Sequence, residues 1–77
     1  MKERLPALKA QDIIGALGRA GFVVIRSKGS HQILAHLADA TRFTVVPVHG
    51  GRDIPRHLVH RIIKQANLTL DGFLELL

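Results

Sequence analysis

The stretch Phe22–Leu37, with the sequence FVVIRSKGSHQILAHL, decides the fold of this chain. Two apolar runs flank a short basic turn that contains Gly29, and a glycine-bearing turn between strand-like runs predicts a β-hairpin. Gly29 permits a tight backbone path, and its missing side chain lets a ligand approach the backbone closely. The second run begins at His31, so the turn delivers a histidine to the start of a strand.

The residues of this turn form a candidate site for anion binding and proton transfer. Arg26 and Lys28 attract an anion, and Ser30 can form a hydrogen bond to one. Histidine, here His31, is the side chain that gains and loses a proton near neutral pH. Taken alone, the same residues also fit a solvated hairpin turn with a surface histidine.

Upstream and downstream of the hairpin, apolar periodicity predicts a helix and a third strand. Residues 10–20 place apolar side chains on one helical face, and Gly21 follows where a C-cap glycine is expected. Residues 42–48 are strand-like and follow a turn at 38–41. We expect the lead-in, residues 1–9, to be loosely held.

A second helix is predicted after a glycine-rich loop. It opens with Ile54 and Pro55, and Asp53 is its expected N-cap. Its apolar residues share one face, whereas the other face carries His57, His60, Arg61 and Lys64. Thr69 is the expected cap of a short C-terminal helical turn.

These elements predict an α+β fold in the order α-β-β-β-α. We expect a three-stranded antiparallel sheet with both helices on one face, which leaves the other face available for a partner. Apolar residues of both parities in the first strand leave its facing open. In a regular strand His31 and His36 point to opposite faces, because side chains alternate.

The composition excludes several classes of protein. With 77 residues the chain can form one small domain, so we expect a single domain over residues 1–77. It has no cysteine, which excludes disulfides and thiolate metal sites. No apolar run is long enough to span a membrane, and the N-terminus lacks the apolar stretch of a signal peptide. We therefore expect a cytoplasmic protein.

Positive charge is concentrated between the glycine turn and the second helix. The formal net charge is +5, and residues 26–64 hold seven Lys and Arg residues against Asp39 and Asp53. Such a surface suits a nucleic acid or an acidic protein, although small basic proteins also gain solubility from charge.

Four motifs follow one another along nearly the whole chain: Ala20-Gly21-Phe22, Gly29-Ser30-His31, Val46-Pro47-Val48-His49 and Ile62-Ile63-Lys64-Gln65-Ala66. Together they resemble the HicA family of toxins from type II toxin–antitoxin systems. The resemblance implies a fold similar to the double-stranded-RNA-binding domain, cleavage of messenger RNA, and neutralisation by a HicB-type antitoxin. It also implies that the histidine of the Gly-Ser-His motif, His31 here, is catalytic.

The chemistry of RNA cleavage agrees with this assignment. Without a metal, a base must take the proton of the ribose 2′-OH while positive groups offset the charge on the phosphate. His31 can be the base, and His49 is a candidate auxiliary group. We expect RNA contacts from Arg26, Lys28, Gly29, Ser30, Arg52, Arg56, Arg61 and Lys64. The acids are scattered, so we expect no metal and no other cofactor.

Two other hypotheses remain open from the sequence. One is a non-catalytic RNA-binding module of the same fold, in which His31 only stacks or forms hydrogen bonds. The other is an interaction protein whose basic face docks an acidic partner. For the toxin we expect a free monomer.

Overall fold

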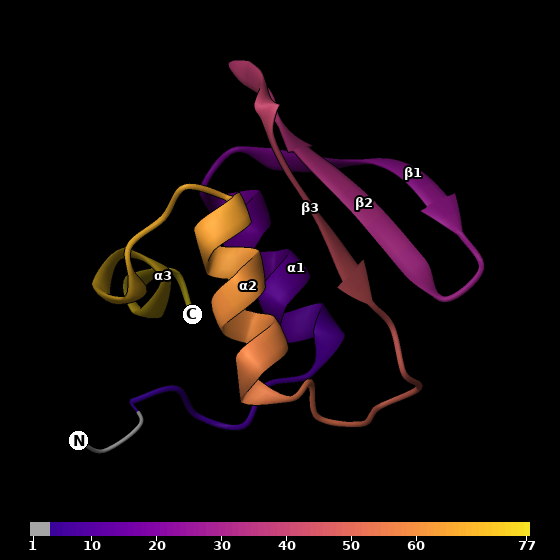
Figure 1. The fold of residues 1–77 in the computed structure, drawn as a ribbon, viewed down its shortest axis with the longest axis vertical. Helices are drawn as coiled ribbons and strands as arrows, with labels where there is room; N and C mark the ends of the chain where they lie inside the picture. Colours follow the sequence, from indigo (N-terminus) through magenta and orange to yellow (C-terminus); the bar gives the residue numbers. More distant parts are fainter. Residues whose placement is uncertain (1–3) are drawn as a thin grey trace.

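A three-stranded antiparallel sheet with helices packed against one face forms the centre of the protein (Figure 1). The computed structural model describes residues 4–77. In chain order the elements are α1 (Ala10–Arg19), β1 (Phe22–Lys28), β2 (His31–His36), β3 (Asp39–Pro47), α2 (Arg56–Gln65) and α3 (Leu70–Leu76). The expected α+β order is confirmed, including the short C-terminal helix.

The predicted β-hairpin is formed by β1 and β2, which pair in antiparallel register. Gly29 has φ 58°, the left-handed conformation that glycine adopts without strain, and it turns the chain back between Lys28 and His31. The register shifts between Val24 and Arg26, so Ile25 is the extra residue of a β-bulge. Both parities of the first strand are apolar because the strand carries apolar residues on both faces: Phe22 is buried, whereas Val23 and Ile25 line a hollow on the other side of the sheet.

The second hairpin differs from the prediction at its turn. β3 begins at Asp39 rather than Arg42, and only Leu37 and Ala38 form the turn. The Asp39 carboxylate accepts hydrogen bonds from the backbone N–H of Thr41, at 3.0 Å, and from its hydroxyl, at 2.5 Å. These local bonds satisfy the backbone N–H of Thr41 near the start of β3. The register shifts between Ala35 and His36, which accommodates residues 40–42.

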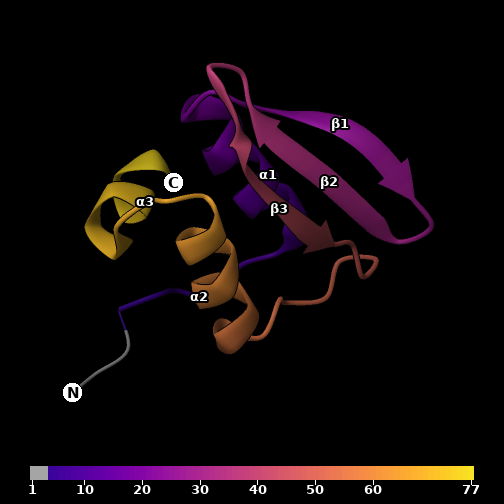
Figure 2. The same ribbon diagram turned by 45° about the horizontal axis from the view of Figure 1, so that its top comes forward.

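One face of the sheet, the inner face, carries Phe22, Leu34, Thr44 and Val46, which are all buried. Helices α1 and α2 both cover this face (Figure 2). The helical periodicity predicted the apolar faces that meet it, and most of their residues are buried: Ala10, Ile13, Leu17, Val59, Ile62, Ile63 and Ala66. Ile14 and Leu58, predicted on the same faces, are half-buried.

The expectation of a loosely held lead-in is wrong for its described residues 4–9. Leu5 and Leu8 are core residues, exposed by only 2% and 6%. The Ile54 N–H donates to the Leu8 carbonyl at 2.7 Å, and Lys9 forms an ion pair with Asp53 at 3.1 Å. The expected cap is also wrong, because Pro55 occupies the N-cap of α2 and no side chain caps it.

Helix α3 packs against α1 and α2 and completes the core. The Thr69 hydroxyl accepts from the Gly72 N–H at 2.9 Å, which confirms the predicted cap. Phe73 is fully buried, so the short helix is held by packing more than by its own propensity. An ion pair between Arg4 and Asp71 ties the lead-in to this helix.

Candidate active site

His31 lies on the face of the sheet that the helices leave uncovered, which we call the outer face. In the register it is opposite Lys28 on β1 and Pro47 on β3. Directly opposite residues of antiparallel strands share a face, with Cβ atoms about 4.5–5.5 Å apart. Both His31 and Lys28 are exposed, so a cationic side chain stands beside the histidine and both face solvent.

Arg26 extends this group along the outer face. It is opposite Ile33, the next residue after His31 that points outward. Neither Arg26 nor Lys28 has a carboxylate partner within residues 4–77, where the ion pairs are Arg4–Asp71 and Lys9–Asp53. We call Arg26, Lys28 and His31 the hairpin cluster; its two cations are left available to an anion.

Two other residues of the turn have backbone roles. A side chain placed on Gly29 would meet no atom within 4 Å, so the space above this glycine is open. The Ser30 carbonyl accepts from the Val48 N–H at 2.6 Å. This bond extends the β2–β3 pairing beyond Pro47 and fixes the position of the hairpin end.

His49 is brought toward the same end of the sheet by that bond. It follows Val48 directly and lines a hollow of about 260 Å³ together with the first turn of α1 and the loop glycines, namely Lys9, Ala10, Gln11, Val48, Gly50 and Gly51. His49 is exposed. The structure therefore places it near the hairpin end but in a separate hollow.

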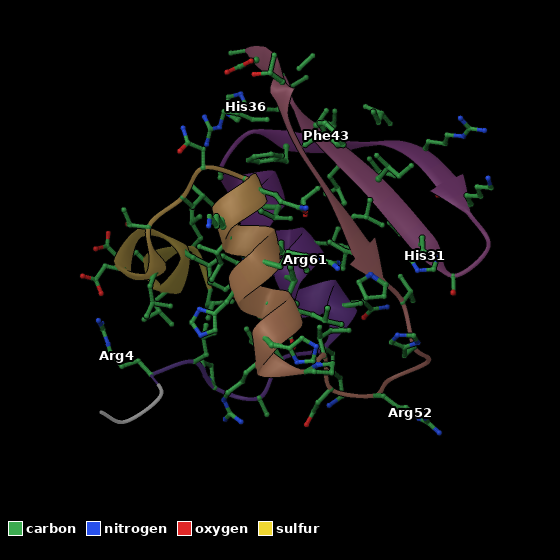
Figure 3. All side chains as sticks on the ribbon, in the orientation of Figure 1. Arg4, His31, His36, Phe43, Arg52 and Arg61 are labelled. Carbon is green, nitrogen blue, oxygen red and sulfur yellow. The ribbon has the colours of Figure 1, made fainter. Side chains whose placement is uncertain are left out.

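The remaining sequence-predicted RNA contacts form a second group, away from His31. Arg61 and Lys64 lie on the exposed side of α2, and Arg52 lies in the loop that precedes it. Figure 3 shows Arg61 on α2 and Arg52 at the loop, both separated from His31 at the end of β2. Arg56 donates its Nε–H to the Leu5 carbonyl at 3.1 Å, so part of its guanidinium holds the lead-in.

Comparison with known proteins identifies the family. Residues 10–68 match the family model described as HicA toxin of bacterial toxin–antitoxin. The chain belongs to the HicA toxin family. The match includes the hairpin cluster and both helices that cover the inner face, whereas the lead-in and α3 lie outside it. A search of curated proteins gave no match.

Membership of a toxin–antitoxin family implies an antitoxin partner for this HicA chain. Within the described residues, no helix is long and apolar enough to cross a membrane. The same residues contain no group of three or more His, Asp or Glu side chains that could hold a metal ion.

The other strand histidine, His36, has a structural role in this HicA chain. It is opposite the buried Phe22, and the two rings meet edge to face with centroids 5.1 Å apart. Its Nε2 is 3.0 Å from the Ala20 carbonyl, and its Nδ1 accepts from the Ala38 N–H at 3.0 Å. A carbonyl only accepts and a backbone N–H only donates, so these bonds favour the tautomer that carries its proton on Nε2. His36 and His31 therefore face opposite sides, as alternation predicted.

The side-chain pKa of Asp39, the first residue of β3, is lowered. Hydrogen bonds from the Thr41 side chain and backbone lower the pKa of Asp39 from its ordinary value of 3.8, and the positive charge of Arg42 acts in the same direction. Asp39 sits at the β2–β3 turn, whereas His31 is at the opposite end of β2. Asp39 is therefore placed to organise the turn, and it does not orient the catalytic candidate.

Proposed function

We propose that this protein is a messenger-RNA-cleaving toxin of a type II toxin–antitoxin system, neutralised by a HicB-type antitoxin in the cytoplasm. The observation that carries the proposal is the Lys28–His31 cross-strand pair on an uncovered face, within a chain of the HicA toxin family. A proton-transfer group beside an unpaired cation is what the cleavage of a phosphodiester requires.

The proposed reaction uses the ribose 2′-hydroxyl as the nucleophile. His31 takes the 2′-OH proton as O2′ attacks the adjacent phosphorus. The bond from phosphorus to the 5′-oxygen breaks, giving a 2′,3′-cyclic phosphate and a 5′-hydroxyl. The leaving oxygen takes a proton from water or from a protonated histidine. This sequence needs no metal or other cofactor.

The hairpin cations have the task of holding the scissile phosphate. Lys28 and Arg26 offer charged donors to the non-bridging oxygens, whose negative charge increases as the phosphorus becomes five-coordinate. The open space over Gly29 allows the RNA backbone to come close to the turn, where Ser30 adds a hydroxyl. His49 is proposed as an auxiliary proton donor. Arg52, Arg56, Arg61 and Lys64 are proposed to bind neighbouring phosphates of the RNA.

The test is expression of the wild type and His31→Ala in a host that lacks an antitoxin, with growth and intact messenger RNA measured together. We expect the wild type to stop growth and degrade message, and folded His31→Ala to do neither. His57→Ala is the matched control, because His57 is an exposed histidine on α2. It should behave as the wild type. Equal cleavage by His31→Ala and the wild type would refute the role of His31.

A purified assay separates the enzyme from the alternative, a non-catalytic RNA-binding module. The substrate is a short RNA and its copy with 2′-deoxyribose at the cleaved position. The proposed mechanism requires that the RNA is cut and that the deoxy copy is bound but not cut. Binding of both without any cleavage would favour the RNA-binding module, and cleavage of both would exclude the 2′-OH as nucleophile.

A further inference from the structure

The small hollow beside His49 lies at the end of the sheet that holds the β1–β2 turn, where the chain leaves β3 (Figure 1). Its volume is about 260 Å³, and its walls come from the start of α1 and from residues 48–51. We call it the loop hollow. Pockets for drug-sized molecules begin at about 300 Å³, so the loop hollow suits one smaller group, such as a single nucleobase.

Hydrogen bonds at both ends of the loop hold the walls of the loop hollow in place. At one end the Val48 N–H donates to the Ser30 carbonyl at 2.6 Å. At the other end the Ile54 N–H donates to the Leu8 carbonyl at 2.7 Å, just before α1 begins. The loop is therefore tied to the hairpin on one side and to the lead-in on the other, so the hollow is formed before any ligand binds.

The turn between these two anchors presents backbone to the hollow. The Arg52 N–H donates to the His49 carbonyl at 3.0 Å, which closes a four-residue turn. Its central residues, Gly50 and Gly51, have φ 52° and 90°, and positive φ at both central positions is typical of a type I′ turn. A Cβ on either glycine would meet no atom within 4 Å. A flat ligand can therefore lie close to this backbone.

The lining suits a neutral flat group better than a phosphate. Val48 is apolar and half-buried, and His49 supplies an exposed ring. Lys9 is the one Lys or Arg in the lining, and its ammonium is already 3.1 Å from the Asp53 carboxylate. The start of α1 also has its own carboxylate, because Asp12 accepts from the Lys9 N–H at 2.9 Å. Negative charge is thus already supplied here, and a phosphate would gain little.

Gln11 gives the loop hollow a group that can read a base. It lines the hollow and is exposed, and within residues 4–77 its carboxamide has no hydrogen-bond partner. A carboxamide offers a donor and an acceptor side by side, which match N7 and the N6 amine of adenine. Proteins that recognise single-stranded RNA commonly take up an unstacked base in this way, with an aromatic ring such as histidine against its face.

We propose that the loop hollow binds an unstacked adenine of the RNA next to the cleaved phosphate, and that Gln11 sets this preference. The proposal rests on the proposed function, because the base belongs to the RNA whose phosphate the hairpin cluster would hold. The two surfaces are close, since Val48 is bonded to Ser30 and consecutive Cα atoms, here Ser30 and His31, are about 3.8 Å apart. The cations then hold the backbone, whereas the hollow reads the sequence.

The experiment measures binding of short RNAs to the His31→Ala protein, which should not cut them. The probes are oligouridine strands with a single central adenine or cytosine, followed by fluorescence anisotropy. The adenine strand should bind at least about 5-fold more tightly, as expected for one bidentate contact to a base. Adding Gln11→Glu should remove this preference, because a carboxylate accepts equally from the amine of adenine or of cytosine and donates to neither.

Two further variants serve as controls for charge. Gln65→Glu makes the same change of charge on α2, outside the lining, and its carboxylate can still accept from the Thr44 hydroxyl. It should keep the adenine preference of the parent. Lys9→Met should keep it too, because the ammonium is paired with Asp53. Equal weakening of both strands by Lys9→Met, without an adenine preference in the parent, would mean that the hollow holds a phosphate and would overturn the proposal.

Cleavage by the protein with an intact His31 separates this proposal from the nuclease itself. Next to adenine the wild type should cut at least about 5-fold faster than next to cytosine, and Gln11→Glu should cut both alike. Cleavage without an adenine preference, or with one that Gln11→Glu retains, would overturn the role of the loop hollow and leave the nuclease standing. An adenine preference in binding that Gln11→Glu removes, without any cleavage by the wild type, would support the loop hollow and refute the nuclease. Failure of the parent to bind either strand would overturn the proposal.

Discussion

The two faces of the sheet have similar side chains and opposite surroundings. The inner face buries Phe22 and Leu34 beneath two helices, whereas the outer face leaves Ile25 and Phe43 in solvent. The same three strands supply both sets. The difference teaches that apolar character alone does not identify the core of this small domain. The inner apolar residues serve stability, whereas the outer ones remain exposed in the folded chain.

The largest expected effect comes from truncating one residue on each face. Leu34→Ala should lower the free energy of unfolding by about 2–5 kcal/mol, because it leaves a cavity beneath the helices. Phe43→Ala should change it by about 1 kcal/mol or less, since a half-exposed ring loses few contacts. Urea unfolding followed by far-ultraviolet circular dichroism measures both, as the chain has no Trp or Tyr. Equal losses would show that the outer face is part of the core.

A second prediction concerns Gly21, which connects α1 to β1. Gly21 has φ 98°, and a Cβ there would lie 2.9 Å from Nε2 of His36. Gly21→Ala should therefore cost at least about 1–2 kcal/mol of stability. Gly18→Ala is the matched control, because it lies in α1 with no atom within 4 Å of the new Cβ. It should stabilise by about 0.5–1 kcal/mol. Equal effects of the two substitutions would mean that neither the positive φ of residue 21 nor its contact with His36 disfavours a side chain there.

The inner face contains one buried polar residue, which gives a third prediction. Thr44 is completely buried, and its hydroxyl donates to Oε1 of Gln65 at 2.7 Å. Thr44→Val should lower stability by about 0.5–1.5 kcal/mol, the usual net value of one hydrogen bond. A double-mutant cycle with Gln65→Met isolates the pair. Strictly additive losses would show that the hydrogen bond contributes nothing.

The smallest effect is expected at the exposed β2–β3 turn, where the faces meet. The pKa of Asp39 is lowered below 3.8 by its bonds to Thr41. A carboxyl with a lowered folded-state pKa adds stability above its unfolded pKa and loses it as pH falls through the folded value. NMR titration of the carboxyl carbon should show the lowered pKa, and Thr41→Val should raise it. An Asp39 pKa at or above 3.8 in the wild type would contradict this assignment.

Local sequence signals predicted the elements well, because turns and helix faces depend on neighbouring residues. Gly29 set the first hairpin, Thr69 capped α3, and helical periodicity selected the buried faces of α1 and α2. Contacts between residues far apart in the chain could not be predicted from the sequence. Leu5 and Leu8 became core residues because Ile54 and Asp53, far along the chain, bind the lead-in. The facing of β1 was likewise hidden, because this strand carries apolar residues on both faces of the sheet.

The candidate site likewise has one part that the sequence predicted and another that only the fold determines. Arg26, Lys28 and His31 belong to one hairpin, so the sequence alone brought them together. The approach of His49 depends on the backbone bond between Val48 and Ser30, which no local pattern announces. The separation of Arg61 and Lys64 from His31 depends on where α2 packs. Their roles in binding RNA remain predictions for the experiments above.

Several cations of this protein are occupied inside the fold. Arg42 donates twice to the Ala66 carbonyl at the end of α2, at 2.8 and 3.0 Å, and Arg19 donates to the Leu76 carbonyl at the end of α3. Arg56 holds Leu5, while Arg4 and Lys9 form ion pairs. Only part of the Arg56 guanidinium is engaged, so the described residues leave Arg26, Lys28, Arg52, Arg56, Arg61 and Lys64 to displace counterions from RNA. With these six cations, the logarithm of RNA affinity should fall with that of salt concentration with a slope of about 4 in magnitude on single strands.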